Sequence, residues 1–84
     1  MIAQLSGLAA AKDQRTVVVD VAGVGYRVYV TTDALARIKI GQPLTLHTHL
    51  AVREDALDLF GFETQHELAY FQLLLTVPGI GPKS

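Results

Sequence analysis

The two strongest strand signals in the chain flank a glycine-containing tetrapeptide, and this arrangement restricts the possible fold more than any other feature. Residues 16–21 read TVVVDV, residues 26–30 read YRVYV, and AGVG stands between them at 22–25. β-Branched and aromatic residues favour strands, and glycine tolerates the positive φ angles of tight turns. We therefore expect a β-hairpin here, with Gly23 and Gly25 both suited to such angles.

Three further segments before residue 63 have strand signals. A first strand begins near Ile2, and Gly7 is expected to bend or bulge it. Residues 44–51 alternate with period two, which places four side chains on one face of a strand: Leu44, Leu46, Thr48 and Leu50. Residues 56–62 resume this alternation and place three residues on one face: Leu57, Leu59 and Gly61.

A short helix is expected between the third and fourth strands. Residues 31–33 (TTD) supply a helix cap, and the following ALARIKI is too short for more than two turns. Five strands with one short helix at that position predict a mainly β fold, a five-stranded OB-type Greek-key barrel over residues 1–62. Periodicity alone also permits other small barrels.

Composition excludes several classes of protein. Half of the chain is apolar and the mean hydropathy is +0.32, which excludes disorder and indicates that some apolar surface lies against another subunit or domain. The absence of cysteine excludes a disulfide scaffold and a thiolate metal site. The first residues do not resemble a signal peptide, so we expect a cytoplasmic location. The net charge of −1 means that any nucleic-acid binding depends on a local patch.

Residues 63–84 are expected to form a helix followed by a glycine turn. TQHE at 64–67 has the pattern of a capping box, and the helix should run to about Val77 because Pro78 disfavours helical geometry before it. The helix is apolar almost all round, so it needs partners on at least two sides. The barrel supplies one of these partners.

The glycine turn, VPGIGPK at 77–83, has the pattern of a helix-hairpin-helix motif. The backbone amides of Gly79 and Gly81 are expected to contact DNA phosphate, because glycine lets the backbone approach an oxyanion closely. Lys83 adds a charge-assisted contact. The competing interpretation is a plain helix C-cap followed by a loop. The expected second helix is absent, which leads to the hypothesis that the sequence is an amino-terminal fragment of a longer protein.

Three segments together resemble the amino-terminal part of the RuvA family, the Holliday-junction-binding subunits of the bacterial branch-migration machinery. They are VAGVGYRVYV (21–30), HTHLAVREDALDLFGF (47–62) and LLTVPGIGPKS (74–84). The resemblance implies an OB-type barrel followed by a domain with two helix-hairpin-helix motifs, of which this chain holds only the start. It also implies a homotetramer in the full-length protein, a RuvB-type motor ATPase bound through a further domain, and a RuvC-type resolvase in the full complex.

The resemblance places the family's acidic pin on Glu54 and Asp55. These adjacent carboxylates would lie exposed at a hairpin tip between Val52 and Ala56, and a four-fold assembly would gather eight of them at its centre. They would repel DNA phosphates, which an open four-way junction can accommodate and a continuous duplex cannot. Residue type alone would favour an ordinary solvated turn.

The chain also has other candidate sites that are interpreted as structural. His47 and His49 share a strand face and His66 lies at the helix start, but no third zinc ligand has a suitable spacing, so exposed strand histidines are expected. Glu54, Asp55 and Asp58 lack a neighbouring nucleophile for acid/base catalysis. No phosphate-binding loop of the GxxxxGK[ST] type is present. We therefore expect a non-enzymatic subunit without a metal or cofactor.

An alternative function is an OB-fold module that binds single-stranded DNA or another protein, with residues 63–84 only a capping helix. Tyr26, Tyr29 and Phe60 could stack on bases, although packing within the core or between subunits is the favoured interpretation of these rings. The leading interpretation is binding of four-way junction DNA in recombination and repair.

Overall fold

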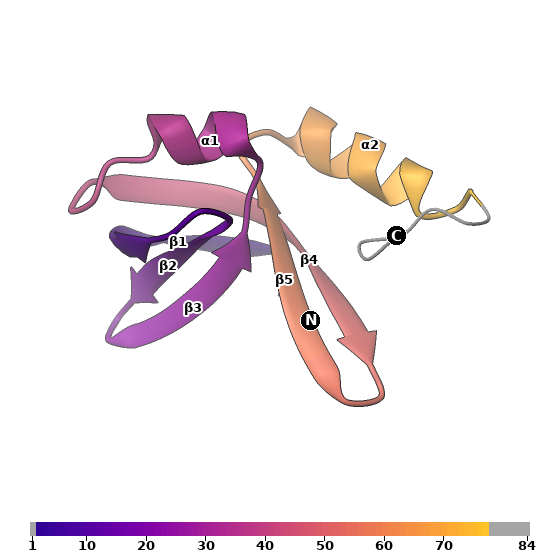
Figure 1. Cartoon of the computed structure of the whole chain (residues 1–84), viewed down its shortest axis with the longest axis horizontal. Helices are drawn as coiled ribbons and strands as arrows, with labels where there is room; N and C mark the ends of the chain where they lie inside the picture. The colour runs from indigo at the N-terminus through magenta and orange to yellow at the C-terminus, as the bar shows by residue number, and fades with distance from the viewer. Residues whose placement is uncertain (1, 78–84) are drawn as a thin grey trace.

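The computed structural model describes residues 2–77 and shows a closed barrel followed by a helix (Figure 1). The elements in chain order are β1 (Gln4–Lys12), β2 (Thr16–Val21), β3 (Val24–Tyr29), α1 (Thr32–Arg37), β4 (Pro43–Arg53), β5 (Ala56–Phe62) and α2 (Gln65–Leu74). Around the barrel the strands follow the order β1-β2-β3-β5-β4, and β4 pairs with β1 to close it. This order, with α1 between β3 and β4, confirms the expected OB-type barrel.

The closure of the barrel depends on a short parallel seam between β3 and β5. This seam pairs Val28 with Leu59 and Tyr29 with Phe60, whereas the other neighbouring strands run antiparallel. Gly61 is buried beside it, and a Cβ atom there would lie 2.6 Å from Val28 Cγ1. A residue without a side chain is therefore needed where the two strands converge.

The alternating residues of the strands build the barrel core, as the sequence predicts. The largest fully buried side chains are Val17, Val19, Val28 and Leu46. The helix α1 adds Ala34, and the residue after it, Ile38, is also buried. The helix cap falls within the expected residues 31–33, since Thr31 Oγ1 accepts a hydrogen bond from the Ala34 amide at 3.1 Å. These contacts bury the apolar faces of the strands against one another and against α1.

The β2–β3 hairpin is confirmed, but its turn differs from the expectation. Ala22 and Gly23 are the two turn residues, with φ angles of 53° and 91°, and the Gly23 amide donates to Asp20 Oδ1 at 2.8 Å. Two consecutive positive φ angles match a two-residue turn that follows the right-handed twist of the strands. The expectation of a positive φ at Gly25 is wrong, because Gly25 lies within β3 and pairs with Asp20.

The irregularity in β1 is also displaced from its expected position. The register between β1 and β2 shifts between Ala9 and Ala11, so the bulge is not at Gly7. Gly7 instead permits a close approach of two strands, since a Cβ atom there would lie 2.2 Å from the backbone oxygen of Asp20. Steric contact, not backbone flexibility, accounts for glycine at this position.

The helix α2 begins as expected and ends earlier. Both halves of the capping box are present, because Thr64 Oγ1 accepts from the Glu67 amide and the Thr64 amide donates to Glu67 Oε1, each at 3.2 Å. The regular helix ends at Leu74, three residues before the expected end. The amides of Thr76 and Val77 bond to the carbonyl groups three residues earlier, so the chain tightens after Leu74. Within residues 2–77, neither helix is long and apolar enough to cross a membrane.

Candidate nucleic-acid interface

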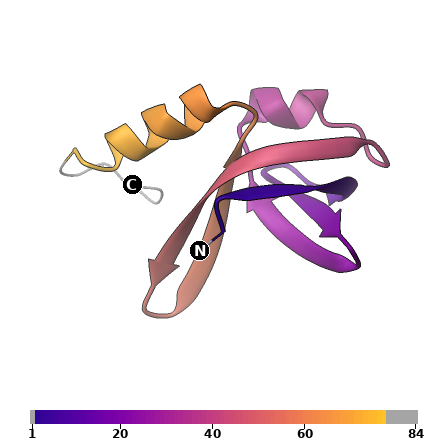
Figure 2. The ribbon, with the colours of Figure 1, turned by 180° about the vertical axis from the view of Figure 1, so that it is seen from behind.

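The β4–β5 hairpin is the most prominent feature of the surface. Its register continues to Arg53 opposite Ala56, which leaves Glu54 and Asp55 as a two-residue turn. Figures 1 and 2 show the far half of this hairpin extending away from α1 and from the other strands as an arm. Both turn residues are exposed. The two carboxylates therefore occupy the extreme end of the arm, the position at which the acidic pin was expected.

One face of the arm carries an exposed apolar pair directly behind the acidic tip. Val52 and Leu57 are opposite each other in the ladder and are 63% and 68% exposed. The expectation that Leu57 shares a face with Leu59 and Gly61 agrees with the strand alternation. Only the latter two are buried, however, because Leu57 lies in the arm and β5 enters the barrel after it. The arm thus presents carboxylates at its end and aliphatic side chains just below.

The other face of the arm carries an ion pair between Arg53 and Asp58. These residues are diagonal neighbours across the two strands, and the Arg53 Nη2 group donates to Asp58 Oδ2. Their side chains are 34% and 18% exposed, so the pair is partly removed from water. We did not expect this pair from the sequence, although it follows from the hairpin register once Glu54 and Asp55 are assigned to the turn.

A cluster of aromatic rings attaches α2 to the outer face of β4 and β5. The Phe71 ring lies 5.5 Å from the Phe60 ring, 5.0 Å from the Phe62 ring and 5.6 Å from the His49 ring. Phe60 also stacks on Tyr29 at 5.4 Å. Rings at these separations pack favourably against each other. Phe60 and Tyr29 are thus engaged within the chain, and Tyr26 packs against the core, which disfavours a base-stacking platform.

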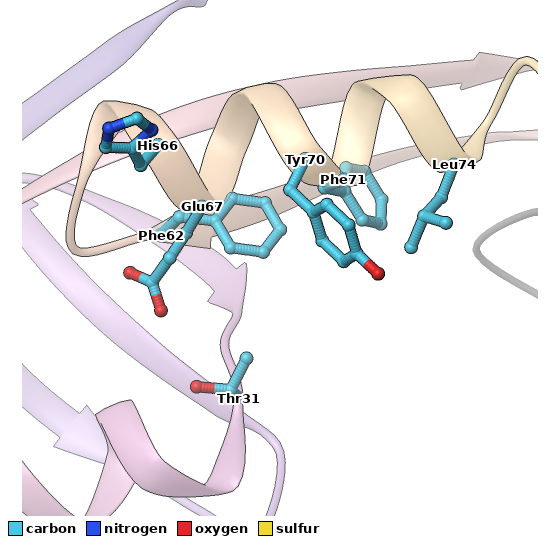
Figure 3. A pocket seen from close by; sticks show the side chains of 7 residues that line it. All are labelled: Thr31, Phe62, His66, Glu67, Tyr70, Phe71 and Leu74. Atoms are coloured by element: carbon cyan, nitrogen blue, oxygen red, sulfur yellow. The ribbon is translucent and has the colours of Figure 1, made fainter.

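An apolar groove of about 430 Å³ lies beside α2. Figure 3 shows the Tyr70 and Leu74 side chains projecting from α2 on the same side as Phe62, with Thr31 across the open space. The barrel covers one side of α2 through Phe71, whereas Tyr70 is 64% exposed. This incomplete cover agrees with the expectation that the helix needs a second partner.

The three histidines do not form a metal site within the described residues. His47 and His49 are half-buried instead of exposed, and His49 Nδ1 lies 3.4 Å from Gln72 Nε2 because α2 covers this strand face. His66 is exposed at the start of α2. Among residues 2–77, no three His, Asp or Glu side chains are grouped in a way that could hold a metal ion.

Two ionisable groups away from the arm have shifted pKa values. Hydrogen bonds from the Arg15 and Thr16 amides lower the pKa of the Asp13 carboxyl in the β1–β2 turn. The hydrogen bond to Glu63 raises the pKa of Arg37 and connects α1 to the segment that precedes α2. Both shifts arise from contacts that hold loops in place, and neither group lies in the arm.

The expected phosphate contacts at Gly79, Gly81 and Lys83 lie outside the described residues. The helix-hairpin-helix assignment and the 63–84 domain boundary therefore stay predictions. The acidic tip, the aliphatic pair and the Arg53–Asp58 ion pair are the parts of the candidate interface that the structure describes.

Comparison with known proteins assigns the chain to a family. Residues 1–61 match the family model described as the RuvA N terminal domain. Relatives named Holliday junction branch migration complex subunit RuvA are 48% identical over 83 residues in Trichlorobacter lovleyi, 46% over 84 in Pseudomonas fluorescens and 47% over 83 in Thermobifida fusca. Each match covers 99% of this chain and 41–42% of the relative, so the chain spans less than half of their length. The chain belongs to the RuvA family.

Proposed function

We propose that the chain binds four-way junction DNA in recombination and repair, as the amino-terminal part of a longer, non-enzymatic subunit. The observation that carries this proposal is the Glu54–Asp55 turn at the end of the β4–β5 arm. The names of the relatives support it, since they describe subunits of a Holliday junction branch migration complex.

The acidic tip acts as a discriminator between DNA shapes. A carboxylate about 7 Å from a phosphate is repelled by roughly 0.6 kcal/mol in bulk water and by about 2.4 kcal/mol where the effective dielectric constant is near 20. Salt at physiological strength screens this repulsion beyond about 8 Å. The tip therefore matters only where DNA is pressed against it. The open centre of a junction leaves room for the tip, whereas a duplex crossing the same point places phosphates on it.

The proposed assembly is a homotetramer that brings four arms to one centre. The exposed Val52 and Leu57 side chains support a contact between copies of the chain. Covering this apolar surface with another chain removes it from water, which is favourable. Eight carboxylates at the centre would strengthen the repulsion and help to separate strands at the crossover.

The remaining roles are assigned to other parts of the complex. Phosphate contacts by Gly79, Gly81 and Lys83 would anchor the duplex arms without reading the bases. A RuvB-type motor ATPase would move the strands, and a RuvC-type resolvase would act on the same junction. The proposed site of action is the bacterial cytoplasm.

A fluorescence-anisotropy titration of the full-length protein tests this function. The DNAs are a four-way junction, a linear duplex and a single strand of equal length, each at several salt concentrations because phosphate contacts make affinity salt-dependent. We expect the tightest binding to the junction. Equal or tighter binding to the single strand would contradict the proposal and favour a base-stacking OB module.

A further inference from the structure

Arg53 is the neighbour of the acidic tip in the sequence. Its positive charge would weaken the repulsion of DNA phosphates that the proposed function requires. Arg53 immediately precedes Glu54 and faces Ala56 across the turn. An arginine side chain is long and flexible enough to reach a carboxylate of the same turn or a phosphate beyond it. If Arg53 did so, its positive charge would offset one of the two carboxylates. The tip would then have a net charge of −1 instead of −2.

The structure holds this cation on the side of the arm. The guanidinium of Arg53 donates through Nη2 to Asp58, and the side chain of Asp58 is only 18% exposed. Strand alternation puts Asp58 on the same face as Arg53, one diagonal step from the tip toward the barrel. The guanidinium is therefore drawn back along the hairpin, away from Glu54 and Asp55.

The hydrogen bonding of Arg53 indicates that Asp58 holds the guanidinium on the side of the arm. Among residues 2–77, Arg53 Nε is the buried side-chain nitrogen that lacks a hydrogen-bond partner. A buried donor without a partner is unfavourable, and the same group would be hydrated if the side chain extended into water. Asp58 offsets that cost through a charge-assisted hydrogen bond. Without this bond, the guanidinium would favour the tip or the solvent.

We propose that Asp58 is a positioning residue for the acidic tip. It sequesters Arg53 on the side of the hairpin, so that Glu54 and Asp55 face the DNA without a cation beside them. This inference rests on the proposed function, because it concerns how the tip excludes duplex DNA.

The test compares Asp58→Asn, Arg53→Gln and the double variant in the full-length protein, with junction and duplex as probes. Asp58→Asn frees the cation, so duplex affinity should rise about two- to fivefold, the size of one solvent-exposed charge contact between the freed Arg53 and a phosphate. The slope of log K against log salt for the duplex should also steepen by about 0.9 for each Arg53 that reaches a phosphate. The double variant has no cation to release and should return to the wild-type preference for the junction.

Arg53→Gln keeps the test decisive if Asp58→Asn unfolds the arm. This variant retains a polar side chain but removes the charge, so the preference for the junction should be kept or increased. A loss of junction affinity in folded Arg53→Gln would overturn the proposal, because it would make Arg53 a DNA contact. Identical selectivity in Asp58→Asn and the double variant would also overturn it, because the ion pair would then serve stability alone.

The variant Glu54→Gln/Asp55→Asn separates this inference from the proposed function. If that variant alters the junction preference and Asp58→Asn does not, the inference fails and the function stands. If neither variant alters it, the role of the acidic tip fails as well.

Discussion

Single residues without side chains determine how closely the strands of this barrel approach. At Gly61 a Cβ atom would meet Val28 Cγ1 at 2.6 Å and Leu46 Cδ1 at 3.1 Å, both in the buried core. At Gly25 the nearest atom is Val18 Cγ1 at 3.1 Å, near the exposed surface of β3. The two strand glycines thus differ in what a methyl group would displace.

Gly61→Ala should destabilise the chain by about 1–3 kcal/mol, the usual cost of forcing an extra carbon into a packed core. Chemical denaturation monitored by circular dichroism measures this change. Gly25→Ala is the matched control and should cost clearly less, because a half-buried valine can move by a few tenths of an ångström. Equal losses for the two variants would show that the parallel seam does not depend on Gly61.

The carboxyl of Asp13 should make stability depend on pH. Its pKa is lowered in the folded chain by hydrogen bonds from the Arg15 and Thr16 amides. Its contribution to folding stability is therefore present above the pKa of the unfolded state, near 3.9. This contribution is lost as the pH falls through the lower pKa of the folded state. The melting temperatures of the wild type and Asp13→Asn should differ most well above the unfolded pKa and should converge as the pH falls through the lower folded pKa. A constant difference across that range would contradict the assignment.

Among the elements, α2 packs on the barrel mainly through the Phe71 ring, with the Gln72–His49 contact beside it. Phe71 contacts rings from both β4 and β5, whereas Leu73, two residues later, is 63% exposed. The helix is also anchored at its start by the Thr64–Glu67 capping box. The position of α2 relative to the arm therefore depends on a small number of contacts.

Phe71→Ala should release α2 from the barrel at a cost of about 1–3 kcal/mol, below the range for a fully buried Phe because this ring is only half-buried. Leu73→Ala should change stability by less than about 0.5 kcal/mol. Hydrogen exchange of the α2 amides is the direct measurement, since a detached helix loses protection while the barrel keeps it. Unchanged protection in Phe71→Ala would refute this account of the docking.

At the scale of the whole molecule, the sequence predicted the barrel because alternation, turn glycines and the Thr31 cap all indicated the same elements. Two expectations about glycines failed for the same reason. Gly7 and Gly25 lie where an added Cβ atom would approach atoms of the neighbouring strand β2, and local conformational preference does not show such contacts.

The sequence predicted the position of the acidic turn in the candidate site but not the contacts around it. Residue types alone suggested only a solvated turn at Glu54 and Asp55, and family resemblance supplied the role proposed for them. The Arg53–Asp58 pair was missed because it depends on the exact strand register, which residue types do not specify.

The aliphatic pair on the arm should contribute to assembly. Val52→Thr/Leu57→Thr in the full-length protein should weaken self-association, because it removes apolar surface that the proposed tetramer covers. Light scattering coupled to size exclusion gives the mass of the complex over a dilution series. Val24→Thr, at the far hairpin and 53% exposed, is the control and should leave the mass unchanged. An unchanged mass for the arm variant would place the interface elsewhere.

The role proposed for the acidic tip is best tested by the junction-to-duplex affinity ratio of Glu54→Gln/Asp55→Asn in the full-length protein. Asp33→Asn, which removes an exposed carboxylate from α1, far from the tip in Figure 1, controls for a general change in charge. We expect that neutralising the tip raises duplex affinity more than junction affinity, so that the ratio falls by at least several-fold, while Asp33→Asn leaves the ratio unchanged. A ratio equal to that of the wild type, in a folded variant that still binds DNA, would contradict the claim that the acidic tip selects the junction.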